Sequence, residues 1–263
     1  MASDADSLDW PALREEAISL IRAAEEGDVL LRLVGSVGIR LHLPAIEEML
    51  DGLRPPPKDL DFVCRRADRS ALRTLLQEHG YENDRNMMVA MEGRRYLFSH
   101  GETGLKLDIF VDRLDFCHRI ELSGRLGVHP LTIPSEELLL HKLQIVDLTA
   151  GDYIDLGVLL ANLVPDGKAA ESSFSTARLL APLANDWGFW RTVTGNLDSV
   201  RKHAEAGGYA MLGAEAACLV AGRAAGLRDA AEILTKGLRW RVRAKLGERM
   251  PWWQDVDDRE GTY

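Results

Sequence analysis

"RLVGSVGIRLH", residues 32–42, joins an apolar run to an amphipathic run through Gly35 and Ser36. We interpret the residues before this pair as a buried strand and those after it as a helix. The start of a helix offers unpaired N–H groups and the positive end of a dipole, and glycine lets the backbone approach a ligand closely. The junction therefore suits a phosphate, although a tight turn with a serine N-cap has the same pattern.

A second strand, "KDLDFV" at residues 58–63, carries two carboxylates on one face. Asp59 and Asp61 project together because alternate side chains of a strand share a face, while Leu60 and Phe62 face the other way. Two carboxylates ~6 to 7 Å apart at the backbone can converge on a hard cation such as Mg²⁺. An edge strand with a solvated acidic face is the alternative.

A third strand, "LKLDIFV" at residues 105–111, places Asp108 opposite an apolar face. If this strand pairs beside residues 59–63, Asp108 joins Asp59 and Asp61. Three carboxylates at one point are the usual requirement for two divalent ions that bridge nucleotide phosphates and activate an attacking hydroxyl. We expect Asp112, near the strand end, to be ordinary solvated charge.

The composition limits the class of protein. The chain of 263 residues has 41 Asp and Glu against 32 Lys and Arg, a net charge of -9, which is unlike a general binder of phosphate backbones. Its three widely spaced cysteines argue against a disulfide framework or a zinc cluster. The N-terminus has no signal-peptide pattern, and no apolar run reaches the ~18 to 20 residues of a membrane span, so we expect a cytoplasmic protein.

The sequence changes in character near residue 165. Before that point helical and strand patterns alternate, with strands expected at 28–35, 59–63, 94–100 and 105–114 and helices at 9–26, 36–43, 45–53 and 66–80. After it, strand patterns vanish and amphipathic helices are expected at 173–184, 186–205, 209–225 and 228–247. We therefore predict an α+β chain with a first domain at 1–164 and a helical C-terminal domain at 165–263.

Three basic features have open interpretations. Arg40 lies one helical turn after Ser36, so it either meets the same phosphate or is solvated. Lys142 shares a helix face with apolar residues, so it either extends to water or points into a pocket for an anion.

Residues 228–249 hold seven Lys or Arg against three Asp or Glu. The overlapping stretch "RWRVRAKLGERMPWW", residues 239–253, interleaves tryptophan with arginine. It is either a surface for bases and phosphates, or an exposed basic helix with Trp240 packed inward and Trp252 and Trp253 clamping the tail.

In combination, these motifs resemble the nucleotidyltransferase superfamily, whose palm is similar to that of polymerase beta. More narrowly, "RLVGSVGIRLH", "PPPKDLDFV" and "LTIPSEELLLHKLQIVDLTAGDYIDL" look like the AbiEii/MenT-type toxin nucleotidyltransferases, over roughly residues 29 to 160. The resemblance implies a mixed β-sheet flanked by helices. It also implies that Gly35 and Ser36 hold a triphosphate tail, that Asp59 and Asp61 bind Mg²⁺ or Mn²⁺, and that Asp108 helps to activate the acceptor.

The resemblance extends to the segment after Lys142. The toxin-like relatives place a lysine here, followed by a helix with "RD-x-x-D", whereas this chain reads "GDYID". Asp152 and Asp155 match the motif, but Gly151 replaces its arginine. These aspartates are therefore expected in the substrate site with Lys142, or as an N-cap and first-turn acid of a helix.

The function implied is transfer of a nucleotidyl group from a nucleoside triphosphate to an acceptor hydroxyl. The resemblance favours an RNA end such as that of tRNA as acceptor, with a small molecule or a protein hydroxyl as alternatives, and it makes an antitoxin protein an expected partner. The absence of G-x-x-x-x-G-K-[ST] removes a P-loop ATPase from consideration. A nucleotide-binding or protein-interaction module that keeps the fold without turnover is the alternative function.

Overall fold

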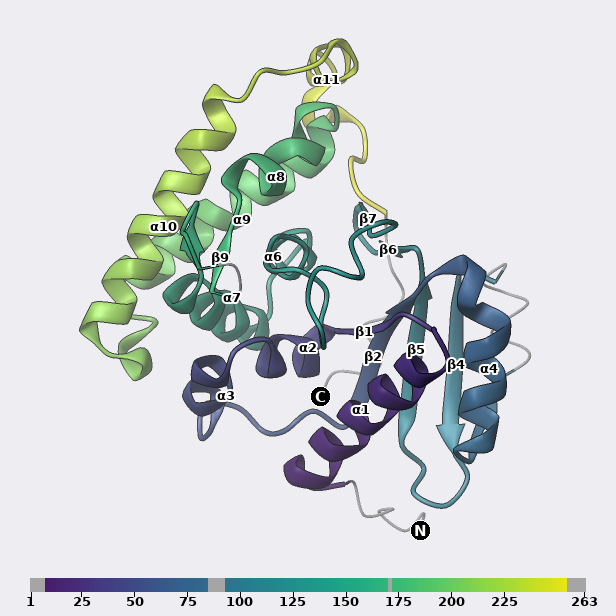
Figure 1. Cartoon of the computed structure of the whole chain (residues 1–263). Helices are drawn as coiled ribbons and strands as arrows, with labels where there is room; N and C mark the ends of the chain where they lie inside the picture. The colour runs from purple at the N-terminus through teal and green to yellow at the C-terminus, as the bar shows by residue number, and fades with distance from the viewer. Residues whose placement is uncertain (1–7, 85–92, 170–171, 255–263) are drawn as a thin grey trace, which may run out of the picture. The chain divides into compact units, whose positions relative to one another are not determined.

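The computed structural model describes residues 8–84, 93–169 and 172–254 (Figure 1). The N-terminal residues 1–7, part of the stretch used to expect a cytoplasmic protein, lie outside that range. Internal contacts divide the chain into two compact units. The first, here called the sheet unit, comprises residues 1–47, 54–114 and 121–134, and the second, the helical unit, comprises residues 48–53, 115–120 and 135–263.

A mixed five-stranded sheet forms the centre of the sheet unit. Its strands are β1 (Leu31–Val34), β2 (Asp59–Cys64), β3 (Tyr81–Asn83), β4 (Arg95–His100) and β5 (Lys106–Val111). They lie in the order β1-β2-β5-β4-β3, with β2 and β5 parallel and the other pairs antiparallel. The mixed sheet with flanking helices confirms the coarse fold expected from the sequence.

Helices of the sheet unit begin within three residues of their predicted starts. They are α1 (Trp10–Glu26), α2 (Gly35–His42) and α4 (Arg69–Glu78), with a 3-10 turn at Arg66–Asp68, and α3 (Pro44–Leu50) follows α2 across the division between units. Asp9 caps α1 by accepting a hydrogen bond of 3.0 Å from the backbone N–H of Ala12. Pro44 starts α3, where a proline without an N–H costs nothing.

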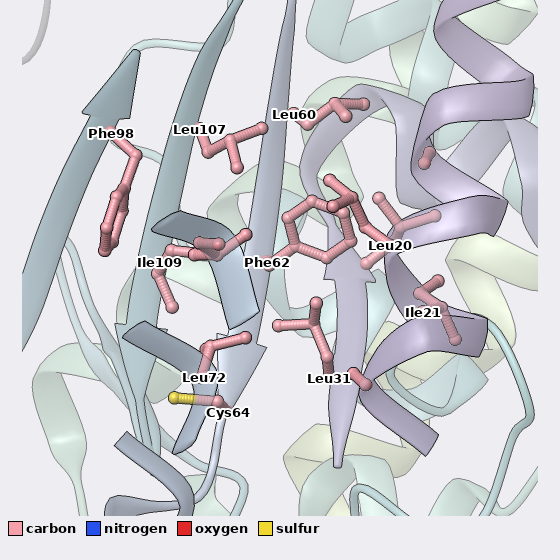
Figure 2. Close-up of a cluster of buried hydrophobic side chains, with 14 of the residues drawn as sticks. Leu20, Ile21, Leu31, Leu60, Phe62, Cys64, Leu72, Phe98, Leu107 and Ile109 are labelled. Atoms are coloured by element: carbon pink, nitrogen blue, oxygen red, sulfur yellow. The ribbon is translucent and has the colours of Figure 1, made fainter. Parts of the chain in front are cut away.

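The core of the sheet unit lies on one face of the sheet, under α1 and α4. Leu20 and Ile21 of α1 pack with Phe62 of β2, Ile109 of β5 and Leu72 of α4 (Figure 2). Each of these side chains contributes ~1.5 to 3 kcal/mol by leaving water. Because strand side chains alternate, this burial turns Asp59, Asp61 and Asp108 toward the opposite face.

The helical unit contains most of the remaining helices. They are α6 (Ser135–Leu143), α7 (Ala150–Asn162), α8 (Thr176–Leu180), α9 (Trp187–Glu205), α10 (Ala214–Ile233) and α11 (Leu238–Ala244), with 3-10 turns at Ala181–Ala184, Ala210–Leu212 and Gly247–Arg249. Two short strand pairs complete the chain: β6 (Arg113–Asp115) with β7 (Arg119–Glu121), and β8 (Val164–Pro165) with β9 (Ser173–Phe174). The helical C-terminal region is thus confirmed, but β9 shows that strands do not vanish after Pro165.

The last two predicted helices are divided at the wrong place. A single helix, α10, continues through the expected gap after residue 225, because its packing against α9 and α7 outweighs the ~1 kcal/mol cost of Gly226 in a helix. The chain breaks instead before α11, at Gly237, whose backbone N–H donates to the carbonyl of Ala184 at 2.8 Å. A Cβ on Gly237 would lie 2.0 Å from Oδ1 of Asn185, so a larger residue here would have to displace that side chain.

The predicted domain boundary between residues 164 and 165 also differs from the boundary between the two units, because the helical unit already includes the chain from residue 135 onward. Helices α6 and α7 belong to the helical unit because α6 packs against α9 and α7 packs against α10. In the described parts of the chain, no helix is long and apolar enough to cross a membrane.

Candidate functional site

The junction between β1 and α2 lies directly against an aspartate of the neighbouring strand. Gly35, the first residue of α2, has φ of +67°, a conformation that favours glycine. A Cβ at this position would lie 2.0 Å from Oδ2 of Asp61 and 3.0 Å from its Cγ. Gly35 is thus required both by its backbone conformation and by the carboxylate beside it, and Ser36 follows as a half-buried residue.

Strand register brings the predicted acidic residues onto neighbouring positions. Asp61 lies opposite Val34, the last residue of β1, and on its other side opposite Asp108 of β5. Paired strands are ~4.8 Å apart, so the backbones of Asp61 and Asp108 are direct neighbours. The predicted pairing of the two acidic strands is confirmed, and Asp59 lies two residues before Asp61 on the same face.

Asp59 carries an electrostatic cost in the folded chain. Although its side chain is exposed, surrounding protein atoms desolvate the carboxyl group and raise its pKa, an effect that a backbone hydrogen bond and the nearby Lys106 offset only in part. Lys106 is its register partner on β5. A carboxylate that the fold disfavours in its charged form is one that an added cation stabilises.

Arg95 on β4 binds Asp108, a role that the sequence analysis did not predict. Its Nε donates to both oxygens of the Asp108 carboxylate, at 2.9 Å to Oδ1 and 2.8 Å to Oδ2, and its Nη2 lies 2.5 Å from Oδ2. The guanidinium also stacks over the ring of Phe110, 5.1 Å from its centroid. The only sequence signal for this role is the alternation that puts Arg95 on the same strand face as Leu97 and Ser99.

The donor set on this face fits a hard divalent cation in part. Mg²⁺ is commonly held by one or two carboxylates together with substrate phosphates, and Asp59 and Asp61 supply that set beside the helix start at Gly35. Among the described residues, no group of three or more His, Cys, Asp or Glu side chains gathers closely enough to hold a metal ion. Asp108 lies next to Asp61 in the sheet, and its carboxylate forms an ion pair with Arg95.

Arg40 is not the solvated alternative considered from the sequence. It is 3% exposed, and its guanidinium lies over the ring of Trp10, 4.6 Å from the centroid. Trp10 in turn donates from Nε1 to Glu47 at 3.1 Å. Arg40 therefore packs α2 against α1.

Lys142, Asp152 and Asp155 form a buried ion cluster within the helical unit. Nζ of Lys142 on α6 lies 2.9 Å from Oδ1 of Asp152 and 2.9 Å from Oδ2 of Asp155, both on α7. Their side chains are 11%, 9% and 1% exposed. The anions that Lys142 meets are thus carboxylates of its own chain, and the alternative in which it extends to water is wrong.

Charge pairing outweighs desolvation in this cluster. Burial alone lowers the pKa of Lys142, but Asp155 and Asp152 raise it more, so the ammonium stays charged. Burial likewise raises the pKa of Asp152, while Lys142 and hydrogen bonds from Thr149 lower it below its usual value. The cluster therefore ties α6 to α7 as a charged group at neutral pH.

The helix-capping alternative for the two aspartates needs correction. Thr149, not Asp152, is the N-cap of α7, and its side chain accepts from the backbone N–H of Asp152. Asp152 completes a capping box by accepting from the N–H of Thr149 at 3.0 Å. Asp155 lies beyond the first turn, and its partner is Lys142.

Other candidate residues are structural in the described parts of the chain. Cys64 is buried, and desolvation with the nearby Asp68 and Asp112 raises the pKa of its thiol to about 12. Asp112 is not simple solvated charge, because its carboxylate accepts from the backbone N–H of Arg66 at 2.9 Å. His42 is buried against Thr132, with 2.7 Å between Nδ1 and Oγ1.

The tryptophans of the basic C-terminal segment pack inward. Trp240 on α11 meets Trp190 on α9 edge to face, with 5.2 Å between ring centroids. Trp252 lies 6.0 Å from Trp187, and Trp253 lies 4.5 Å from Trp252. This arrangement fits the alternative of a basic helix whose aromatic residues stabilise the protein rather than stack on bases.

No protein-family model matches the chain, and no curated protein matches it in sequence.

Proposed function

We propose that the sheet unit binds a nucleoside triphosphate with Mg²⁺ or Mn²⁺ and transfers its nucleotidyl group to an acceptor hydroxyl. The observation that carries this proposal is the contact between Gly35 and Asp61, where a Cβ would lie 2.0 Å from the carboxylate oxygen. It puts the N–H groups of a helix start beside a carboxylate pair, and phosphates and a divalent cation are the groups that these two features attract.

Each residue of the site has a distinct part in this proposal. The backbone at Gly35 and Ser36 binds the terminal phosphates, which the dipole of α2 favours. Asp59 and Asp61 hold the cation, which when bound polarises the phosphoryl oxygens and orients the nucleotide. Asp108, fixed by Arg95, is oriented to accept a hydrogen bond from the acceptor hydroxyl. Lys142, Asp152 and Asp155 stabilise the helical unit in this account.

A transfer assay tests the proposal. The full chain is incubated with Mg²⁺ and a cell extract, and with each nucleoside triphosphate labelled at either the α- or the γ-phosphate. Nucleotidyl transfer moves the α-label, and not the γ-label, onto an acceptor, and the Asp59→Asn/Asp61→Asn variant loses it. Transfer of the γ-label would assign a different phosphoryl chemistry to the site.

A second candidate is a nucleotide-binding module without turnover. The observation in its favour is that Arg95 contacts both carboxylate oxygens of Asp108, the residue proposed to face the acceptor. Such a module binds the nucleotide with Mg²⁺ but transfers neither label. The same assay, combined with a measurement of nucleotide binding, therefore separates the two candidates.

The acceptor is a proposal carried by sequence resemblance, which favours an RNA end over a protein hydroxyl or a small molecule. Trp240 and Trp252 pack against tryptophans of α9, which weakens the aromatic support for RNA binding at the C-terminal segment. The labelled product decides the matter: nuclease sensitivity identifies RNA, protease sensitivity a protein, and resistance to both a small molecule. An antitoxin protein as partner also rests on the resemblance.

A further inference from the structure

Exposed apolar side chains are concentrated on the C-terminal segment of the helical unit. Leu238 is 76% exposed, Val242 58% and Leu246 45%. These three residues are spaced by four, so they share one face of α11 and of the turn that follows it. We call them the α11 ridge. Isolated exposed apolar residues are ordinary, but an aligned set marks a surface that a partner covers.

The orientation of α11 explains why this face is outward. Trp240 packs on Trp190, and the guanidinium of Arg243 lies over the ring of Trp187 at 4.8 Å, so these side chains anchor the inner face of the helix. At 3.6 residues per turn, Leu238 and Val242 lie about 200° from Trp240 around the axis. The two faces of α11 thus differ, because the inner face contacts α9 whereas the ridge is exposed among the residues that the structure describes.

Cations flank the ridge on both sides. Arg239 follows Leu238 directly, Lys245 precedes Leu246, and Arg249 lies shortly after. In the part of the chain that the structure describes, no ion pair or side-chain hydrogen bond engages these three cations, whereas Arg228, Lys236, Arg241 and Arg243 of the same segment bind neighbouring groups. The charge available to a partner is therefore positive and lies beside the apolar residues.

We propose that the α11 ridge is the docking site for an acidic amphipathic helix of another protein. The aliphatic ridge fits a second apolar helix face, and its flanking cations fit Asp or Glu on that helix. A second copy docked through the same ridge would oppose like charges, because a two-fold interface sets each patch against itself. Nucleic acid fits this surface less well, because bases stack on aromatic rings, whereas the ridge is aliphatic and Trp240 of α11 packs on Trp190 of α9.

The test uses two synthetic amphipathic helical peptides with the same leucine spacing, one with Glu and one with Lys at the flanking positions. Binding to the full chain is followed by fluorescence anisotropy at low salt. We expect the Glu peptide to bind and the Lys peptide not to. The Val242→Glu variant should weaken the Glu peptide by at least about tenfold. Val128→Glu is the matched control, because Val128 is a valine of the sheet unit that is also 58% exposed.

A charge-reversal variant keeps the test independent of the apolar change. Arg239→Glu/Lys245→Glu should exchange the preference, so that the Lys peptide binds and the Glu peptide does not. Equal binding of both peptides, or unchanged binding to Val242→Glu, would overturn the proposal.

Three other results would overturn it by naming a different occupant. A dimer of the native protein that Val242→Glu converts to a monomer would identify a second copy. Salt-sensitive tRNA binding lost in the charge-reversal variant, without peptide binding, would identify a nucleic-acid surface. Binding of the Glu peptide only to a full-length Asp255→Asn/Asp257→Asn/Asp258→Asn variant would identify the chain's own acidic C-terminus.

Discussion

Gly35 is the residue on which the proposed nucleotide site most depends, and a second glycine serves as its control. Gly104 also has positive φ, +69°, but a Cβ there would have no heavy atom within 4 Å. Gly104→Ala should therefore lower the free energy of unfolding by only the backbone cost, about 1 to 2 kcal/mol. Gly35→Ala should lower it by a further ~1 to 3 kcal/mol, because the methyl group displaces Asp61.

Urea unfolding of the two variants measures this difference, and nucleotide binding gives a second readout. Gly104→Ala should bind Mg²⁺ and nucleotide like the native protein, while Gly35→Ala should not. Equal loss of stability in both variants, with binding retained, would show that Asp61 does not depend on the glycine.

Arg95 neutralises Asp108 on the same sheet face. The two side chains are 18% and 13% exposed, so removing the cation leaves a largely buried carboxylate with its main countercharge gone. Arg95→Met should lower the free energy of unfolding by about 2 to 4 kcal/mol. Arg22→Met on α1 is the control, because Arg22 is exposed and should change stability by less than ~0.5 kcal/mol. Thermal unfolding of both variants checks this, and equal melting temperatures would contradict the assigned role.

At the scale of elements, Lys142 joins α6 to α7. Lys142→Met leaves two buried carboxylates without their cation, so it should lower the free energy of unfolding by about 3 to 5 kcal/mol. Lys202→Met on α9 is the control, because Lys202 is exposed and has no ion pair in the described residues. Denaturant unfolding distinguishes them. A Lys142→Met protein as stable as the control, but unable to bind nucleotide, would return Lys142 to the substrate site.

Local patterns were enough to predict the elements that carry the acidic residues. Alternation in β2 and β5 fixes which face each aspartate occupies, and the Gly-Ser pair fixes where β1 ends, because both signals lie within a few residues of sequence. Arg95 escaped prediction because its role depends on β4 lying next to β5, which is a fact of sheet order. The sequence analysis placed Lys142 with Asp152 and Asp155, but not their pairing with one another, because that depends on how α6 packs against α7.

The C-terminal helices show where local propensity fails. Gly226 and Gly237 are both followed by Leu-Arg, so their local sequences do not distinguish them. Gly226 nevertheless lies inside α10, whereas Gly237 precedes α11. The difference is tertiary, because α10 packs along α9 whereas the backbone N–H of Gly237 donates to the carbonyl of Ala184. The sequence pattern of a single helix does not contain information about its packing partners. For the same reason, the domain boundary predicted at residue 164 missed that α6 and α7 pack with the later helices.

At the scale of the whole molecule, buried histidines set the response to acid. Burial lowers the pKa of His42 and of His141 to about 3 and that of His118 to about 4, all below the ordinary value of 6.5. The unfolded chain therefore binds more protons than the folded chain below pH 6.5, so stability present at neutral pH is lost as the pH falls from there toward 4. Each histidine should remove roughly 2 kcal/mol by pH 5.

Urea unfolding at pH 8 and pH 5 measures this loss. His118→Gln should lose less stability over this interval than the native protein, because one buried proton-binding site is gone. His79→Gln should behave like the native protein, since His79 is exposed on the surface. Identical losses in all three proteins would show that the buried histidines do not govern the acid response.

If Asp59 and Asp61 bind a nucleotide together with a divalent cation beside Gly35, that binding depends on both carboxylates and on the cation. Isothermal titration calorimetry of the full chain with each nucleoside triphosphate, with Mg²⁺ and with chelator, measures this dependence. We expect binding only with Mg²⁺, lost in Asp59→Asn and in Asp61→Asn and kept in Glu102→Gln, which removes an exposed carboxylate of the same unit. Unchanged Mg²⁺-dependent binding in the two aspartate variants, or equal binding in chelator, would contradict it.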